Sequence, residues 1–251
     1  MAEWLPLAAS AEAAGIDAEL GLVHLLMLVL FIGWGGWFAY LLVRFSRRAS
    51  PRASYAGTRG RVAMAVVALV AVTELTLLAA VSLPAWRARA TSVPTDPGAT
   101  EVRVVAEQFA WNIHYPGADR RFGRTALALV SPDNPLGLDR VDPAAADDVV
   151  GVNELHVPVG RPVIVYLSSK DVVHSFTLPE MRVKQDVVPG TLATTWFTPT
   201  RTGRWEIACS QLCGLAHYRM RGIFTVDEDA AYVSWLGEQA PFARTAPAPG
   251  R

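Results

Sequence analysis

The sequence predicts an α+β membrane protein in which an N-terminal hairpin of two transmembrane helices is followed by a β-sandwich or barrel. Two long apolar runs, 20–43 and 62–85, predict the helices, because a helix needs about 20 apolar residues to cross a bilayer. Beyond residue 100 the pattern changes to short runs rich in β-branched and aromatic residues, separated by Gly and Pro. Such runs are typical of a sandwich or a barrel.

The composition excludes some functions. The 251 residues carry 23 basic and 23 acidic side chains and a formal net charge of zero, so no global basic field indicates a nucleic-acid partner. Hydrophobic residues make up 51% of the chain, and their excess lies near the N-terminus. The two cysteines of the chain lie in one short loop, which leaves no Cys-x-x-Cys-His motif for haem attachment.

The charges around the two apolar runs predict the orientation of the hairpin, which spans 20–90. Residues 1–19, a short external segment, contain acids and no basic residue, whereas the loop over 44–61 contains six arginines and no acid. The positive-inside rule places such a loop in the cytoplasm. We therefore expect a multi-pass protein of the bacterial cytoplasmic membrane, with both termini on the periplasmic side.

Glu74 is the charged residue within the second apolar run. With a rise of about 1.5 Å per residue, it lies past the middle of the membrane from the cytoplasmic side. A carboxylate at this depth is costly and usually faces protein or water. Two hypotheses stay open: a protonated Glu74 hydrogen-bonded to Thr73, Thr76 or a partner subunit, and a Glu74 that takes part in a proton path at a subunit interface.

The rest of the chain divides by composition. A stretch rich in Pro, Gly and Thr over 91–100 predicts a linker, and 101–239 predict the globular domain. Within it, 116–150 contain prolines and scattered acids, which indicate a long excursion over the surface. Early acids and helical periodicity predict a short helix over 228–238, and the Ala- and Pro-rich tail 240–251 is expected to be disordered.

The candidate chemistry lies in residues 209–220, Cys-Ser-Gln-Leu-Cys-Gly-Leu-Ala-His-Tyr-Arg-Met. Two cysteines, His217 and Met220 offer thiolate, imidazole and thioether donors, which suit copper far better than magnesium or calcium. A mononuclear blue-copper loop would carry one cysteine, whereas two sulfurs can bridge a pair of metals. The loop therefore predicts a dinuclear copper site.

Two other interpretations of the loop stay open. Cys209 and Cys213 could form a strained disulfide in an oxidising compartment. A structural zinc could take both cysteines and His217, although its fourth ligand would usually be Cys or His and not Met. The copper interpretation needs one more nitrogen, and His174 in the upstream segment Asp-Val-Val-His-Ser is the natural supplier.

These motifs resemble subunit II of the haem–copper cytochrome c oxidases and its copper A centre. In that family a D-x-x-H-S segment is joined by a C-x-x-x-C-x-x-x-H-x-x-M loop, and the resemblance covers nearly the whole chain. It implies a cupredoxin-like Greek-key β-sandwich. It also implies that both cysteines bridge two coppers and that the remaining ligands are His174 and Met220 on one copper, and His217 with the backbone carbonyl of Gln211 on the other.

The resemblance implies a role within a larger complex. Electrons from cytochrome c, soluble or membrane-bound, would enter at the copper pair and pass to the haems of subunit I, which also carries copper B. Oxygen reduction coupled to proton pumping would occur in subunit I, and subunit III is a further expected partner. No nucleic acid is expected to bind.

The sequence departs from the family pattern in three places. Many members have Glu where this chain has Gln211, which makes the magnesium at the subunit interface doubtful. The segment Glu107-Gln-Phe-Ala-Trp-Asn resembles the family's aromatic Q-W-x-W segment, so Phe109 and Trp111 are the candidates for taking up electrons. The family's carboxylate at a proton channel has no counterpart, because no acid lies between Arg61 and Thr73.

Three other classes of protein share some features with this sequence. A membrane-tethered, thioredoxin-like copper chaperone has its cysteines before its histidine, whereas here His174 precedes the cysteines. Nitrous oxide reductase has a copper A domain, but its large propeller does not fit in 251 residues. A quinol oxidase subunit shares the hairpin and the sandwich but lacks the copper ligands.

Overall fold

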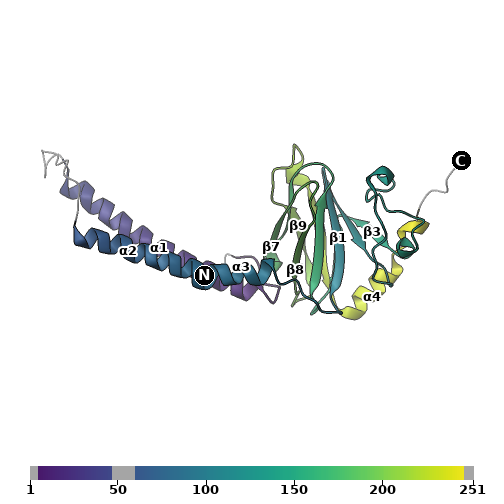
Figure 1. Cartoon of the computed structure of the whole chain (residues 1–251), viewed down its shortest axis with the longest axis horizontal. Helices are drawn as coiled ribbons and strands as arrows, with labels where there is room; N and C mark the ends of the chain where they lie inside the picture. Colours follow the sequence, from purple (N-terminus) through teal and green to yellow (C-terminus); the bar gives the residue numbers. More distant parts are fainter. Residues whose placement is uncertain (1–4, 47–59, 246–251) are drawn as a thin grey trace. The chain divides into compact units, whose positions relative to one another are not determined.

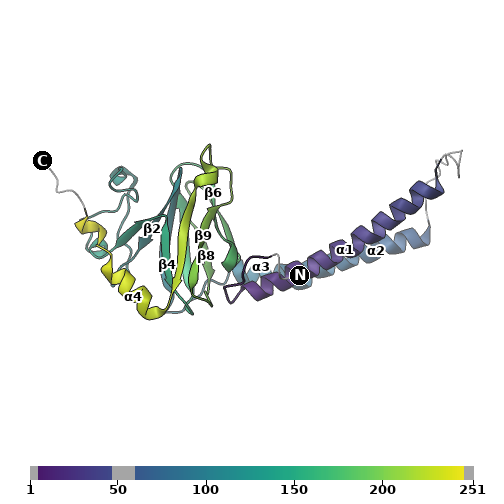
Figure 2. The ribbon, with the colours of Figure 1, turned by 180° about the vertical axis from the view of Figure 1, so that it is seen from behind.

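The computed structural model describes residues 5–46 and 60–245. The chain divides into two compact units, Gly15–Ser92 and Val93–Arg251 with Ala2–Ala14. Figures 1 and 2 show the helices and strands of the chain from opposite sides. Most of the arginine-rich loop and the end of the tail, from residue 246, lie outside the described residues.

Two long helices form the first unit. Helix α1 spans Ala13–Arg44, and α2 (Arg61–Leu77) continues through a π-helical turn, η2 (Leu78–Ser82), into α3 (Leu83–Ala90). Both stretches are long and apolar enough to cross a membrane, and nothing in the most apolar part of either is buried within the protein. This exposure distinguishes them from the core helices of a soluble protein and agrees with the predicted membrane helices.

The π-helical turn explains why the second helix runs to Ala90, beyond the expected boundary at 85. Pro84 sits in the first turn of α3. Inside a regular α-helix its ring would clash with the carbonyl four residues earlier, at Ala80, and one hydrogen bond would be missing. The wider π-turn lies just before Pro84 and takes up this misfit, so the helix continues.

The second unit is a sandwich of two five-stranded sheets. One sheet has the order β3-β2-β1-β5-β8 and the other β4-β10-β9-β6-β7. Each is mixed: β1 pairs parallel with β5 and β10 pairs parallel with β4, while the other pairs are antiparallel. The strands are β1 (Thr100–Glu107), β2 (Ala110–Tyr115), β3 (Val149–Val152), β4 (Glu154–Pro158), β5 (Val163–Ser169), β6 (His174–Leu178), β7 (Val183–Val187), β8 (Ala193–Phe197), β9 (Gly203–Cys209) and β10 (Arg221–Asp227).

The hydrophobic core lies between the two sheets and follows from the alternation of the strands. In β1, Val102, Val104 and Ala106 are buried, and the residues between them are only partly buried. In β2, by contrast, every residue after Ala110 is buried. The second face of β2 must therefore be covered by other parts of the chain.

The excursion between β2 and β3 provides that cover. His114, on the outer face of β2, lies 2.6 Å from the Asp148 carboxylate, and both side chains are buried. The same carboxylate accepts a hydrogen bond of 2.8 Å from the backbone N–H of Gly123. A small second core follows, consisting of Leu138, Ala145 and Phe242.

Phe242 belongs to the stretch that the sequence predicts to be disordered, yet it is buried in a 3-10 turn, η7 (Phe242–Arg244). Its N–H donates to the carbonyl of Asp148. Residues 246–251 lie outside the described residues.

The short segment before α1 is part of the sandwich. The backbone N–H of Ala9 donates to the carbonyl of Glu180 at 2.9 Å, and the N–H of Thr200 donates to the carbonyl of Ala9 at 2.8 Å. The Ser10 hydroxyl donates to the carbonyl of Met181. These partners come from distant parts of the sequence, so the local pattern of residues 1–19 gave no sign of them.

Helix α4 (Asp229–Glu238) confirms the helix predicted over 228–238. Its Trp235 stacks on the imidazole of His156, with ring centroids 4.0 Å apart, and meets Tyr115 edge-on. Tyr232, one turn earlier, is buried. The helix therefore packs on the sandwich through an aromatic cluster.

Candidate metal centre

Residues 209–220 connect two adjacent antiparallel strands. Cys209 is the last residue of β9, and Met220 immediately precedes β10. The N–H of Cys209 donates to the carbonyl of Met220 at 3.3 Å, which closes the base of the loop. The ladder of the two strands therefore fixes both ends of the loop.

His174 reaches the loop through strand pairing. It is the first residue of β6, and two residues later Phe176 pairs with Cys209. The N–H of Ser210 then donates to the carbonyl of Ser175 at 3.0 Å. The expected association of His174 with the loop is thus produced by the β6–β9 pairing.

The donor atoms of the predicted ligands converge. Donor atoms of His174, Cys209 and Cys213 all lie within 4.8 Å of one another. The two sulfurs are 3.8 Å apart. The Cys213 sulfur lies 3.5 Å from Nδ1 of His217 and 3.7 Å from the Met220 sulfur.

The remaining donors lie around the pair of sulfurs. Nδ1 of His174 lies 3.1 Å from the Met220 sulfur and 4.0 Å from the Cys209 sulfur. The carbonyl oxygen of Gln211 lies 3.3 Å from the Cys209 sulfur. A tetrahedral ion with bonds of about 2.0–2.3 Å holds its donors about 3.3–3.8 Å apart; the separation of 3.3 Å falls in this range, and those of 3.1 and 4.0 Å lie just outside it.

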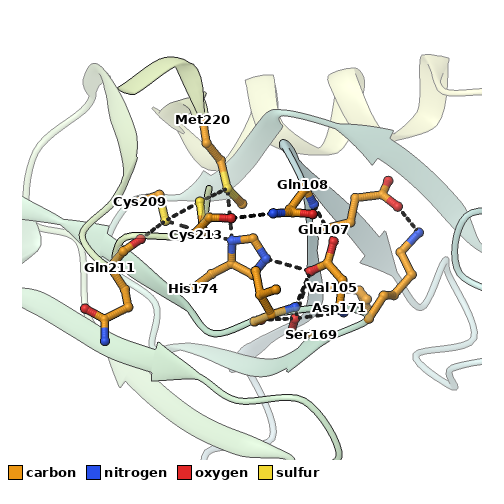
Figure 3. A network of polar contacts seen from close by, with 12 residues as sticks. Val105, Glu107, Gln108, Ser169, Asp171, His174, Cys209, Gln211, Cys213 and Met220 are labelled. Atoms are coloured by element: carbon orange, nitrogen blue, oxygen red, sulfur yellow. Dashed lines mark hydrogen bonds and ion pairs between the residues drawn. The ribbon is translucent and has the colours of Figure 1, made fainter. Parts of the chain in front are cut away.

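A carboxylate orients His174. Nε2 of His174 lies 2.9 Å from Oδ1 of Asp171, as Figure 3 shows. The carboxylate accepts a hydrogen bond from the N–H at Nε2, so the proton stays on Nε2 and Nδ1 keeps its lone pair toward the sulfurs. Burial alone would raise the pKa of Asp171, but hydrogen bonds from His174 and from the N–H groups of Gln108 and Val172 lower it.

The centre is buried on one side and open on the other. His174, Cys213 and Met220 are buried, whereas Gln211, Leu212 and Leu215 are exposed. Burial raises the pKa of the Cys213 thiol to about 11, and the neighbouring Cys209 acts in the same direction. Because metal binding requires the thiolate, loading this site must displace a proton.

The two aromatic candidates occupy different positions. Trp111 is fully buried, and its ring meets those of His174 and Phe176 edge-on, with centroids 6.2 and 5.5 Å away. Phe109 is half-buried and packs against the core. Of the two, Trp111 is beside a predicted ligand, and Phe109 is nearer the surface.

Asp171 and Gln108 are functional candidates that sequence reasoning passed over. Asp171 is the first residue of the segment Asp-Val-Val-His-Ser, and its position three residues before His174 was the available signal. Gln108 carried no comparable signal, because its contacts with Asp171 and Cys213 cross 63 and 105 residues of sequence.

Comparisons with known proteins agree on one family. Residues 100–226 match the family described as cytochrome c oxidase subunit II, periplasmic domain. An alternative cytochrome c oxidase subunit 2 from Bradyrhizobium diazoefficiens is 39% identical over 208 residues, covering 82% of this chain and 74% of that protein. Cytochrome c oxidase subunit 2 from Synechocystis is 27% identical over 260 residues, covering 94% and 76%.

A solved structure is also similar. The periplasmic domain of subunit II of a cytochrome oxidase from Bradyrhizobium japonicum aligns with a TM-score of 0.43 at 30% identity. The alignment covers 59% of this chain and 96% of that one.

Proposed function

This chain belongs to the cytochrome c oxidase subunit II family, and from this premise we propose that it is the subunit through which electrons enter a haem–copper terminal oxidase. It would accept them from cytochrome c at a dinuclear copper centre and pass them to the haems of subunit I. The proposal is carried by one observation: thiol, imidazole and thioether donors from β6 and the β9–β10 loop converge within shared-ligand distances.

The contact between His174 and Met220 supports a specific ligand assignment. Cys209 and Cys213 would bridge the two coppers. His174 and Met220, whose donor atoms are 3.1 Å apart, would complete one copper. His217 and the carbonyl of Gln211 would complete the other. The mixed set fits copper because it combines soft sulfur with imidazole donors.

When bound, the copper pair would take up and release one electron at a time. The protein's part is to hold the donors still, since small movements between redox states keep the barrier to electron transfer low. His174 is fixed by Asp171 and by its strand, and the two cysteines are fixed at β9 and by the loop. Buried Trp111 and Phe176 exclude water from the inner side.

Trp111 and Phe109 are the proposed route for electrons from the donor. Trp111 touches the His174 side of the centre, and the more exposed Phe109 lies toward the surface. Met220 is proposed as a weak axial ligand that tunes the reduction potential, because axial ligand identity is a known determinant of copper potentials.

The membrane helices and the family place the protein in a membrane with its sandwich on the outer side. We propose further that both termini face the periplasm and that subunits I and III bind the hairpin. Oxygen reduction and proton pumping would take place in subunit I. The exposed side chain of Gln211 offers an amide where a carboxylate would suit magnesium better, so no magnesium is assigned here.

The test is copper loading of the full chain in detergent. We expect two coppers per chain and the absorption of a thiolate-bridged pair, both lost in Cys213→Ser. Ser210→Ala, on the same loop, is the matched control, because Ser210 is exposed. Two coppers and an unchanged spectrum in Cys213→Ser would refute the bridging role of this thiolate.

A further inference from the structure

Gln108 connects the two halves of the metal centre. It stands in the turn between β1 and β2, and its side-chain Nε2 donates a hydrogen bond of 2.5 Å to the carbonyl of Cys213. Its backbone N–H donates to Oδ2 of Asp171 at 2.7 Å. Figure 3 shows the amide directed at the Cys213 carbonyl. One residue thus holds both the loop and the carboxylate that orients His174.

The loop is shaped to receive this turn. Gly214, which follows Cys213, has a φ of +135°, which L side chains rarely adopt. A Cβ there would lie 2.6 Å from Nε2 of Gln108 and 3.1 Å from Cζ of Phe109. The close approach of the turn to the loop therefore requires glycine at this position.

The turn is itself firmly held. Glu107 forms an ion pair with Lys170, and its other carboxylate oxygen accepts a hydrogen bond of 2.9 Å from the side chain of Asn112. Ala106 pairs with Trp111 across the turn. The Gln108 amide is therefore presented from a rigid support, as a positioning group needs to be.

We propose that Gln108 is a positioning residue of the copper centre, which fixes the Cys213 segment of the loop and thereby tunes the reduction potential. The N–H end of the Gln108 amide is the positive end of its dipole, and it lies beside the segment that carries the Cys213 thiolate. A fixed dipole in this direction favours the more electron-rich, reduced form. The proposal rests on the proposed function, because it concerns the same metal centre.

The test replaces the amide without changing the backbone. Gln108→Leu keeps the size and the backbone N–H to Asp171 but removes the hydrogen bond to Cys213. Gln239→Leu is the matched control, since Nε2 of Gln239 also donates to a backbone carbonyl, that of Trp235 on α4. Gln108→Asn, which is too short to reach, is a second variant in case the leucine variant does not accumulate.

Copper content, the absorption and paramagnetic resonance spectra and the midpoint potential are measured on the full chain in detergent. We expect both Gln108 variants to have a lower midpoint potential, with an electron-transfer equilibrium changed by about three- to tenfold, where tenfold is about 59 mV for a one-electron couple. Loss of copper from a variant that unfolds like wild type would also support the proposal.

A potential and spectrum equal to those of wild type and Gln239→Leu in both Gln108 variants would overturn it. Failure of the proposed function looks different, because wild type itself would then bind no copper pair.

Discussion

At the scale of single residues, Trp111 is fully buried beside the proposed ligand His174, whereas Phe109 is half-buried. The ring of Trp111 is edge-on to His174, and its indole N–H has no hydrogen-bond partner among the described residues. A buried polar group without a partner normally carries a cost. Trp111 has two possible roles: electron uptake, because it lies beside the proposed ligand His174, and packing of the core.

Trp111→Phe separates these two roles. The smaller ring leaves space in the core, so we expect the free energy of unfolding to fall by about 1–3 kcal/mol. We also expect copper to be retained and the oxidation of reduced cytochrome c by the assembled oxidase to slow. Trp205→Phe is the control, because Trp205 packs against Phe224 in the same core. Wild-type rates in Trp111→Phe with full copper content would leave packing as its role.

The candidate ligand residues were recognisable because their donor types and spacing are unusual in a short loop. Their arrangement around His174 could not be predicted, because the pairing of β6 with β9 depends on contacts across the whole sandwich. Gln108 illustrates the limit: an exposed polar residue in a turn is ordinary until the structure brings the Cys213 carbonyl within reach.

At the scale of elements, the helices could be predicted because their sequence signals are local. Segments whose structure depends on distant contacts could not be predicted. The apolar runs and the helix over 228–238, with its early acids, were recognisable from residues close in sequence. The burial of Phe242 and the pairing of Ala9 with residues 180 and 200 depend on surfaces that form only after folding. Periodicity within these segments carries no information about such partners.

Helix α4 offers a pH-dependent test of its packing. Burial raises the pKa of Tyr232 to about 12, although nearby Arg161 opposes the shift. A raised pKa means that the folded state favours the neutral phenol. Its contribution to stability is therefore complete below the unfolded pKa of about 10 and is lost as the pH rises through the folded pKa.

A shift of this size corresponds to about 3 kcal/mol. About 2 kcal/mol of this is lost between pH 10 and pH 12, so over that range we expect the free energy of unfolding of wild type to fall by about 2 kcal/mol more than that of Tyr232→Phe. Tyr115, whose pKa is raised first by burial and to a lesser degree by the charge of Tyr232, is present in both proteins, so its own burial affects both profiles and Tyr232 is the main difference between them. Urea unfolding of the full chain in detergent, followed by near-ultraviolet circular dichroism, measures the difference. Parallel pH profiles for the two proteins would show that Tyr232 does not titrate as its burial requires.

At the scale of the whole molecule, the hairpin and the sandwich have different roles. The sandwich carries the proposed metal donors, and no residue among 5–46 and 60–245 buries the most apolar part of either helix. A subunit of an oxidase complex needs such apolar surfaces, because neighbouring subunits and lipid cover them after assembly. Glu74 is the exception on these surfaces, since it is a carboxylate among apolar side chains.

The structure reduces the number of possible hydrogen-bond partners of Glu74. The hydroxyls of Thr73 and Thr76 donate to the carbonyls of Leu69 and Val72, at 2.9 and 2.7 Å. Glu74 is exposed and has no hydrogen bond or ion pair within the described part of the chain. Neither threonine is therefore bonded to Glu74, and a partner subunit is the remaining source of a hydrogen bond.

Two substitutions test this assignment in the assembled oxidase. Glu74→Gln keeps the shape and can still form hydrogen bonds, so we expect normal assembly, turnover and proton pumping across pH. Glu74→Leu removes the group that would form the hydrogen bond, and the matching group of the partner subunit would then be left unpaired at a cost of about 1–3 kcal/mol; we expect less assembled complex. Loss of pumping in a fully assembled Glu74→Gln oxidase would contradict the structural role and assign Glu74 to a proton path at the subunit interface.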